Sequence, residues 1–76
     1  MMKTIVIVTK KIRLQKGLTC QQVADKCGIS NAEVSRIENG LRDPSIRTLF
    51  AISQALEVEF EDTYEFRYIE KNPQSG

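Results

Sequence analysis

The 76-residue sequence contains no histidine and no tryptophan, and only two cysteines and two prolines. Without histidine the chain lacks the commonest general acid–base residue and a preferred zinc ligand. Two cysteines are too few for the disulfide framework of a small secreted domain. No apolar run approaches the roughly 20 residues that a membrane-spanning helix requires. These absences argue against secreted disulfide-rich, membrane-spanning and histidine-dependent catalytic proteins.

Signatures of catalysis and metal binding are also missing. The sequence has no nucleophile-elbow and no phosphate-loop motif, and its carboxylates are concentrated in a solvated C-terminal tail. Cys20 and Cys27 are seven residues apart, without the CxxC spacing and the further ligands of a zinc site. We therefore expect no enzyme activity, no metal and no cofactor. Cys27 is interpreted as a small core residue, and redox sensing by Cys20 at a helix start stays an alternative.

Length and charge suggest one small intracellular domain with two electrostatic halves. A chain of 76 residues is expected to form a single domain (1–76) with a small core and no attached ligand-sensing domain. Without a secretion signal it is expected to be cytoplasmic. Residues 1–56 carry nine Lys/Arg and four Asp/Glu, whereas residues 57–76 carry two and six. The basic half suits a phosphate backbone, and the acidic tail is expected to face away from it.

The segment from residue 19 to residue 40 carries two short helix patterns joined by one glycine. Thr19 and Gln22 form a T-x-x-Q capping box, which predicts that a helix begins at about Cys20. Its inward face consists of Val23, Ala24 and Cys27. Gly28 follows, and glycine reaches the positive-φ backbone of a helix end without a side-chain clash. The first helix of the pair is therefore expected to end there.

A second capped helix is expected after the glycine. Ser30 and Glu33 repeat the capping pattern as S-x-x-E, and Val34 and Ile37 form an inward stripe in a helix that runs to about Asn39. The outward face carries Asn31, Ala32, Ser35 and Arg36. Asparagine can pair with adenine, arginine with guanine or phosphate, and an alanine methyl can lie against the thymine methyl. Singly these are ordinary solvated residues, but together they predict a helix-turn-helix that reads the major groove.

A fourth helix is predicted to open at Pro44 and Ser45. Its residues at nearly helical spacing are assigned to the core: Ile46, Leu49, Phe50, Ile52, Ser53 and Leu56. Phe50 is interpreted as packing rather than as a ligand contact.

The two ends of the chain have strand-like patterns. Residues 64–68 alternate with period two and residues 4–8 form a β-branched run, so both favour strands. They could pair within one subunit or between two, or the N-terminal run could begin the first helix. Four of the five aromatic residues lie in the tail, and aromatic residues are enriched at interfaces. We therefore assign segments 1–8 and 59–70 to strands or dimerisation, with Phe60, Tyr64, Phe66 and Tyr68 at the interface, and residues 71–76 to a frayed end.

Residues 9–58 resemble the XRE family of DNA-binding domains, which includes phage Cro and repressor proteins. The resemblance rests on Gly17-Leu18-Thr19, Val23-Ala24, Gly28-Ile29-Ser30, the run from Val34 to Gly40, and Pro44-Ser45 through Leu49. It implies a mainly α, lambda repressor-like bundle of four to five helices, to which the terminal segments could add a short β ladder. It also implies a transcriptional regulator, in particular a repressor, that binds a palindromic operator in double-stranded DNA as a homodimer. By position, Asn31, Ala32, Ser35 and Arg36 would contact bases.

The resemblance also implies residues that position the domain on the phosphates. Asn39 and Arg42 flank the loop after the third helix, which lies along the DNA backbone in similar proteins. Gln21 and Lys10 complete the expected phosphate contacts. Cys20 departs from the pattern, since the family commonly has a phosphate-binding glutamine there. Gln21 points about 100 degrees away around the helix and so does not simply replace it.

Two further positions matter for the first helix. By resemblance, Arg13 pairs with Glu38 and ties the first helix to the reading helix; alternatively, Arg13 belongs to a solvated basic helix. Thr9 is a second departure, standing where the family usually has an apolar residue.

A competing interpretation of the whole chain is an antitoxin-like or adaptor module whose acidic aromatic tail binds a protein partner. This interpretation and DNA binding are compatible.

Overall fold

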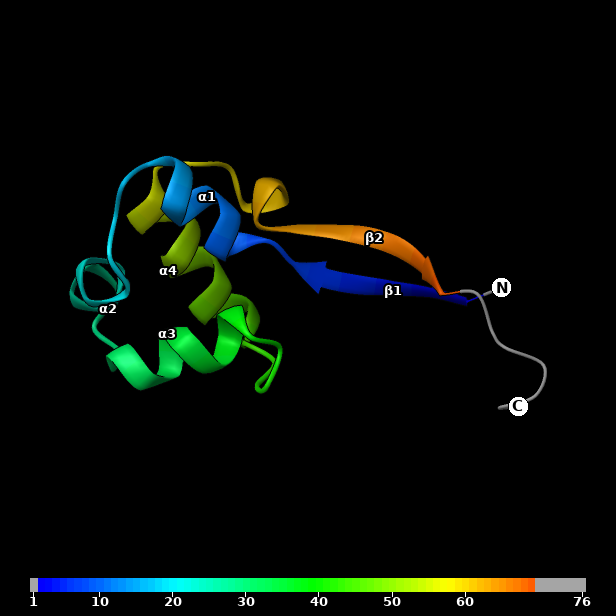
Figure 1. Ribbon diagram of the computed structural model, residues 1–76, viewed down its shortest axis with the longest axis horizontal. Coiled ribbons are helices and arrows are strands. Elements are labelled where there is room, and N and C mark those ends of the chain that lie inside the picture. Colours follow the sequence, from blue (N-terminus) through cyan, green and yellow to red (C-terminus); the bar gives the residue numbers. More distant parts are fainter. Residues whose placement is uncertain (1, 70–76) are drawn as a thin grey trace.

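Four α-helices form a bundle from which a two-stranded β-ribbon projects (Figure 1). The computed structural model describes residues 2–69. Along the chain the elements are β1 (Met2–Ile7), α1 (Thr9–Gln15), α2 (Cys20–Cys27), α3 (Asn31–Glu38), α4 (Ile46–Leu56), a 3-10 helix (Phe60–Thr63) and β2 (Tyr64–Ile69). This is the mainly α, lambda repressor-like fold with a terminal β ladder that the sequence predicts. Over the described range, none of the helices has the length and apolar character needed to span a bilayer.

Side-chain caps fix where α2, α3 and α4 begin. The Gln22 N–H donates to Thr19 Oγ1 at 3.0 Å, and the Thr19 N–H donates to Gln22 Oε1 at 2.7 Å, so the predicted capping box is complete. Ser30 and Ser45 each accept from the backbone N–H three residues later. Such caps satisfy donors that have no partner within the helix. The predicted helix starts are confirmed.

The turn between α2 and α3 depends on a left-handed residue. Gly28 has φ of 71° at the C-cap of α2, and its N–H donates to the Ala24 carbonyl. The Ile29 N–H donates to the same carbonyl at 3.1 Å. A residue with a Cβ is strained in this backbone region, which explains why glycine stands there. The chain leaves α2 sharply enough for α3 to begin three residues later.

The core lies between α2, α3 and α4. Its buried apolar residues are Val23, Ala24, Val34, Ile37, Ile52, Ala55 and Leu56. Ala24 is completely buried, so α3 and α4 approach α2 closely at that position. Cys27 packs against this cluster while half-buried.

Two residues that the sequence assigns to this core lie outside it. Ile46 is 77% exposed and Phe50 is 50% exposed. They are four residues apart and therefore share one face of α4, whereas Ile52, Ala55 and Leu56 form the buried face. Ser53 takes a buried position because its hydroxyl donates to the Phe50 carbonyl at 2.6 Å. The core assignment of Ile46 and Phe50 was wrong because apolar spacing does not show how wide a stripe the neighbouring helices cover.

The terminal strands pair antiparallel within one chain, which decides among the alternatives that the sequence left open. The register runs from Met2 opposite Ile69 to Ile7 opposite Tyr64, and the Val8 N–H continues the pairing by donating to the Thr63 carbonyl. The strand predicted from residues 64–68 is confirmed by β2, and residues 60–63 of the segment 59–70 form the 3-10 helix, at whose start the Glu59 N–H donates to Asp62 Oδ2 at 3.2 Å. Residues 70–76, including the expected frayed end, lie outside the described residues.

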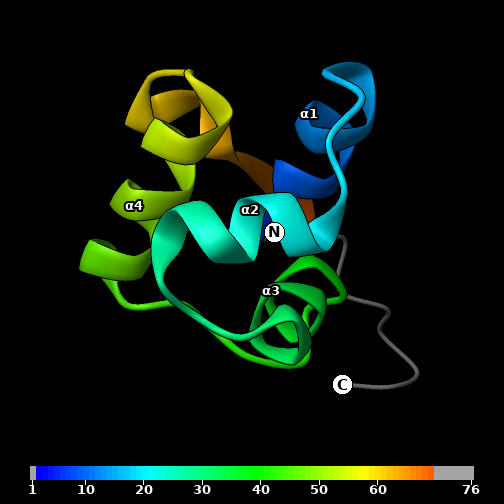
Figure 2. The same cartoon turned by 90° about the vertical axis from the view of Figure 1, so that its left-hand side faces the viewer.

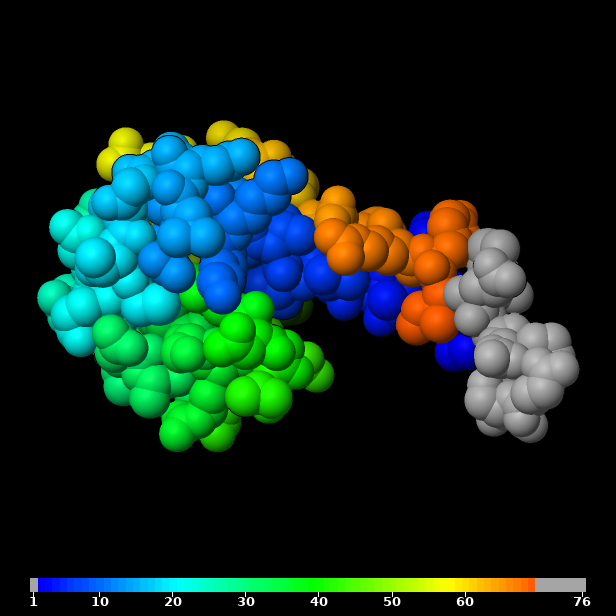
Figure 3. Space-filling view, viewed as in Figure 1, coloured from blue at the N-terminus to red at the C-terminus, as the bar shows by residue number. Residues whose placement is uncertain are grey.

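The ribbon has two chemically different faces. Because residues opposite each other in an antiparallel pair share a face, one face carries Lys3, Ile5, Ile7, Tyr64, Phe66 and Tyr68. The other face carries Met2, Thr4, Val6, Glu65, Arg67 and Ile69. We call the first the aromatic face. In Figure 3 the ribbon forms a narrow arm that protrudes from the bundle.

Thr9, the departure noted in the first helix, is 2% exposed, and its hydroxyl has no hydrogen-bond partner in the described part of the chain. An unsatisfied buried hydroxyl is destabilising by about 1–3 kcal/mol. We therefore expect Thr9→Val, which keeps the shape and removes the hydroxyl, to raise the free energy of unfolding by about 1 kcal/mol in urea denaturation.

Thr63 provides the matched control, because it is equally buried but its hydroxyl donates to the Phe60 carbonyl at 2.6 Å. Thr63→Val should lower the free energy of unfolding by about 1 kcal/mol. Equal effects of the two substitutions would show that hydrogen bonding at Thr9 does not determine the result.

Candidate nucleic-acid interface

Helix α3 lies at the edge of the bundle, with one face packed and the other free (Figure 2). Val34 and Ile37 are buried against the core. The residues expected to contact bases are on the free face: Asn31, Ala32 and Arg36 are exposed, and Ser35 is half-buried. The structure therefore brings together all four on one surface. An isolated helix face of this kind has the shape that enters a major groove.

Gln21 is joined to this surface by a contact between the two helices. The Asn31 side-chain amide donates to Gln21 Oε1 at 3.2 Å, and the Gln21 amide donates to Asp25 Oδ1 at 2.7 Å. The first residue of α3 is thereby held against the beginning of α2. The sequence suggests a phosphate contact for Gln21 and carries no signal for its hydrogen bond with Asn31, so this contact was not predicted.

The far end of α3 carries the remaining polar groups of the surface. The Asn39 side-chain amide donates to Ser35 Oγ at 3.3 Å, which links an expected phosphate contact to an expected base contact. Arg42 is exposed in the loop that follows. Lys10 is exposed at the start of α1, and its charge acts on the Cys20 thiol at the start of α2. The four expected phosphate contacts, Gln21, Lys10, Asn39 and Arg42, thus lie along the starts of α1 and α2 and the end of α3.

Glu33 has a different role from the one that the sequence suggests. Ser30 caps α3 as predicted, but the Glu33 carboxylate lies 3.3 Å from Arg42 Nε and 3.8 Å from Arg36 Nη1. The Glu33 side chain does not complete the S-x-x-E capping box and lies in these two ion pairs instead. The pair with Arg36 follows from its i, i+3 spacing. The pair with Arg42 crosses a turn and has no signal in the sequence.

Arg13 and Glu38 form an ion pair that connects α1 to the end of α3. Arg13 Nε donates to Glu38 Oε2 at 2.6 Å and Arg13 Nη2 donates to Glu38 Oε1 at 3.2 Å, a bidentate arrangement. Arg13 Nη1 also donates to the Leu18 carbonyl at 2.8 Å. The two side chains are only 11% and 5% exposed, so Arg13 does not belong to a solvated face. Hydrogen bonding to Glu38 raises the pKa of Arg13, which stays charged.

Cys20 lies beside this ion pair. Its Sγ is 3.5 Å from Glu38 Oε1. Burial and the Glu38 carboxylate raise the pKa of the Cys20 thiol, although the charges of Arg13 and Lys10 act in the opposite direction. Burial raises the pKa of Cys27 as well. Because the thiolate is the reactive form of cysteine, the geometry at Cys20 disfavours the redox chemistry that was left open.

The domain is a helix-turn-helix of the kind found in DNA-binding transcription regulators. It has two capped helices, a left-handed glycine between them, and a free face with hydrogen-bonding side chains on the second helix. A helix-turn-helix family model, HTH_3, matches residues 10–62. The chain therefore belongs to the HTH_3 helix-turn-helix family, the XRE type that the sequence resembles. Within residues 2–69, no group of three or more histidine, cysteine or acidic side chains is arranged to hold a metal ion.

Two curated proteins are similar to part of this chain in sequence, and one solved structure is similar to it in fold. YqaE of Bacillus subtilis, an uncharacterised HTH-type transcriptional regulator, is 44% identical over 52 residues, which are 68% of this chain and 45% of YqaE. Antitoxin HipB of Escherichia coli is 39% identical over 49 residues, 64% of this chain and 56% of HipB. The restriction-modification controller protein C.AhdI from Aeromonas hydrophila superposes with a TM-score of 0.71 at 25% identity, over 72% of this chain and 83% of C.AhdI. The matched segment spans about half the length of the two curated relatives.

Breaking the buried ion pair should destabilise the protein. We expect Arg13→Ala to lower the free energy of unfolding by about 3 kcal/mol, because it leaves the Glu38 carboxylate buried without its partner. Urea denaturation measures the change. Lys10→Ala, which removes an exposed cation from the same helix, should change it by less than about 0.5 kcal/mol. An unaltered unfolding midpoint for Arg13→Ala would contradict a stabilising role for the pair.

The raised thiol pKa predicts a pH dependence. Below the ordinary cysteine value of 9.0, Cys20 is protonated in the folded and the unfolded protein, so its contribution to stability is complete. As the pH rises above that value, the unfolded thiol ionises first and this contribution is lost. The stability difference between the native protein and Cys20→Ala should therefore decrease between pH 8 and pH 10. Measured in urea, a difference independent of pH would contradict this account.

Proposed function

We propose that the protein is a sequence-specific transcriptional regulator that represses genes by binding a palindromic operator as a homodimer. The proposal includes a cytoplasmic location, where the operator DNA would be. Membership of the HTH_3 family supports DNA binding. The homodimer and the palindromic operator rest on the geometry of α3 and of the ribbon, and repression rests on the resemblance to phage repressor proteins.

One observation carries the proposal. The free face of α3 presents Asn31, Ala32, Ser35 and Arg36 together, with three of them exposed and Ser35 half-buried. Arg36 would donate to guanine or a phosphate, and Asn31 would pair with adenine. The Gln21 contact holds Asn31 in place, which reduces the freedom lost when a base is bound. The base-reading set is therefore partly ordered before DNA arrives.

The expected phosphate contacts surround this set. Arg42 and Asn39 would bind the backbone on one side, and Gln21 and Lys10 on the other. These contacts fix the position of α3 in the groove and supply affinity that depends on salt rather than on sequence. The acidic residues of the tail would keep the opposite end of the molecule away from the phosphates.

A second candidate function is protein binding by the tail, as in an antitoxin-like or adaptor module. Phe66 and Tyr68 favour it, because both are exposed on the ribbon, and the similar protein HipB is an antitoxin by name. The two candidates differ in what they require of α3. A module that binds a protein partner through its tail needs no base contact from Arg36.

Selection from a pool of random duplexes at two salt concentrations tests the proposal directly. A homodimeric reader should enrich a palindrome whose half-sites are about 34 Å, one helical turn, apart. Binding that weakens with salt but enriches no sequence would leave only an electrostatic surface. If the protein binds no DNA, the result would favour a module that binds a protein partner through its tail.

Substitutions then separate base reading from phosphate binding. On the selected operator, Arg36→Ala should weaken binding by about 1–3 kcal/mol and relax the preference at one position of each half-site. Arg42→Ala should weaken binding equally for all sequences and reduce the salt slope by less than one, because Glu33 already pairs with Arg42. Arg67→Ala removes the same charge from the projecting ribbon and should leave operator affinity unchanged. Equal effects of Arg36→Ala and Arg67→Ala would contradict the proposed role of α3.

A further inference from the structure

Two side-chain amides at the junction of α2 and α3 are oriented by a carboxylate. The Gln21 amide donates to Asp25 Oδ1 at 2.7 Å, and Gln21 Oε1 accepts from the Asn31 amide at 3.2 Å. Asp25 stands four residues after Gln21 and therefore on the same side of α2. Over residues 2–69 Asp25 takes part in no ion pair, so no cation competes with Gln21 for this carboxylate. The three residues form a hydrogen-bond relay that ends at the first residue of α3.

The direction of this relay follows from the chemistry of its first member. An amide side chain carries donors on one side and an acceptor on the other, so by itself it can bind in either of two orientations. An ionised carboxylate has acceptors only. Asp25 therefore binds the NH2 group of Gln21 and turns the Gln21 carbonyl toward Asn31. That carbonyl in turn accepts from the NH2 group of Asn31, so the orientation of both amides is fixed.

We propose that Asp25 is a positioning residue that makes Asn31 select adenine over guanine. The inference rests on the proposed function and names what determines the base preference at one position of the operator. With one N–H held by Gln21, Asn31 presents its second N–H and its Oδ1 to the groove, a donor beside an acceptor. Adenine offers the matching N7 acceptor and N6 donor, whereas guanine offers two acceptors, N7 and O6. A reversed Asn31 amide, bound through Oδ1, would present donors alone and suit guanine.

Contact with DNA favours the same orientation. Gln21 is one of the expected phosphate contacts, and its NH2 group has a second hydrogen besides the one that binds Asp25. That hydrogen can donate to a phosphate oxygen, whereas a reversed Gln21 would turn its carbonyl toward the phosphate. The DNA also displaces water from these exposed side chains, which strengthens the hydrogen bonds that remain. The relay is therefore more strongly directional in the complex than in the free protein.

The adenine-to-guanine ratio of affinities at the position read by Asn31 tests the proposal. That position is the one whose preference disappears in Asn31→Ala on the operator obtained by selection. Asp25→Asn keeps the shape of the side chain but supplies donors as well as an acceptor, so Gln21 can bind it in either orientation. The ratio should fall about fivefold, with the gain going to guanine and not to pyrimidines. Asp25→Glu, which again offers acceptors only, should keep the native ratio.

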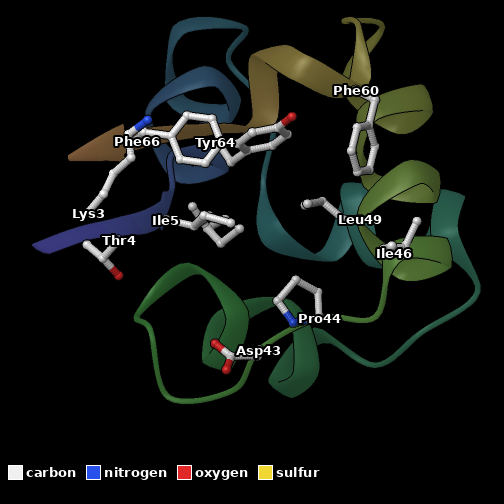
Figure 4. Close-up of a pocket in the computed structure, with 11 residues that line it drawn as sticks. Lys3, Thr4, Ile5, Asp43, Pro44, Ile46, Leu49, Phe60, Tyr64 and Phe66 are labelled. Atoms are coloured by element: carbon white, nitrogen blue, oxygen red, sulfur yellow. The ribbon is translucent and has the colours of Figure 1, made fainter. Parts of the chain in front are cut away.

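Two controls separate orientation from charge. Asp43→Asn removes an exposed carboxylate at the groove between the aromatic face of the ribbon and the start of α4 (Figure 4). Like Asp25→Asn, it should strengthen binding to all sequences by reducing repulsion of the phosphates, but it should leave the ratio unchanged. Gln21→Glu removes the donor to Asp25 and keeps an acceptor for Asn31. Its affinity should fall, because Gln21 is an expected phosphate contact, yet adding Asp25→Asn to it should not alter the ratio.

NMR of the free protein tests the relay without DNA. In the native protein one hydrogen of the Asn31 side-chain amide should have a smaller temperature coefficient than the other, and Asp25→Asn should remove this difference. An enriched operator whose adenine-to-guanine ratio is unchanged by Asp25→Asn would overturn the proposal and leave the proposed function intact. Equal changes of the ratio in Asp25→Asn and Asp43→Asn would also overturn it. A protein that shows the NMR difference but selects no DNA sequence would contradict the proposed function and, with it, the role of Asp25 in base preference, while the relay itself would be confirmed.

Discussion

The orientation of α3, the proposed reading helix, depends on one buried ion pair. Arg13 contacts Glu38 at the end of α3 and the Leu18 carbonyl just before α2, so a single guanidinium group joins three parts of the bundle. A buried carboxylate is tolerated only when its oxygens are paired, and here both are. Helix α3 contributes two buried apolar side chains to the core, Val34 and Ile37. Such a small contact would leave the angle of α3 loosely defined, and the directional bonds to Glu38 specify it.

Most of the fold was predictable because its signals are local. Thr19 and Gln22 are three residues apart, and Gly28 ends α2 through its own backbone, so neighbouring residues suffice to predict both features. The strands followed from residue type and alternation. The exposure of Ile46 and Phe50 was not predictable in this way. Whether an apolar face is covered depends on how far the other helices extend over α4, and no pattern within α4 encodes that.

In the candidate site, too, the features with local signals were predictable and those that depend on tertiary contacts were not. The free face of α3 follows from the period of the helix, so Asn31 and Arg36 were placed correctly from spacing alone. The contacts that hold them, from Gln21 to Asn31 and from Glu33 to Arg42, join segments brought together by the turns. A capping motif suggested where Glu33 would point, and two nearby cations redirected it. The sequence thus places the candidate residues on one exposed face of α3, while the tertiary structure determines how they are ordered.

The Glu33 carboxylate acts as an internal counterion for the proposed DNA-binding surface. With Arg36 and Arg42 already beside it, a DNA phosphate that binds either arginine must compete with a negative charge inside the protein. The number of cations on the surface then overstates the number of salt ions released from DNA on binding. Attraction to arbitrary DNA is reduced, whereas hydrogen bonds to a matching base are made in addition. A single glutamate on the flank of α3 would therefore lower the affinity for DNA of any sequence and increase the selectivity for a matching sequence.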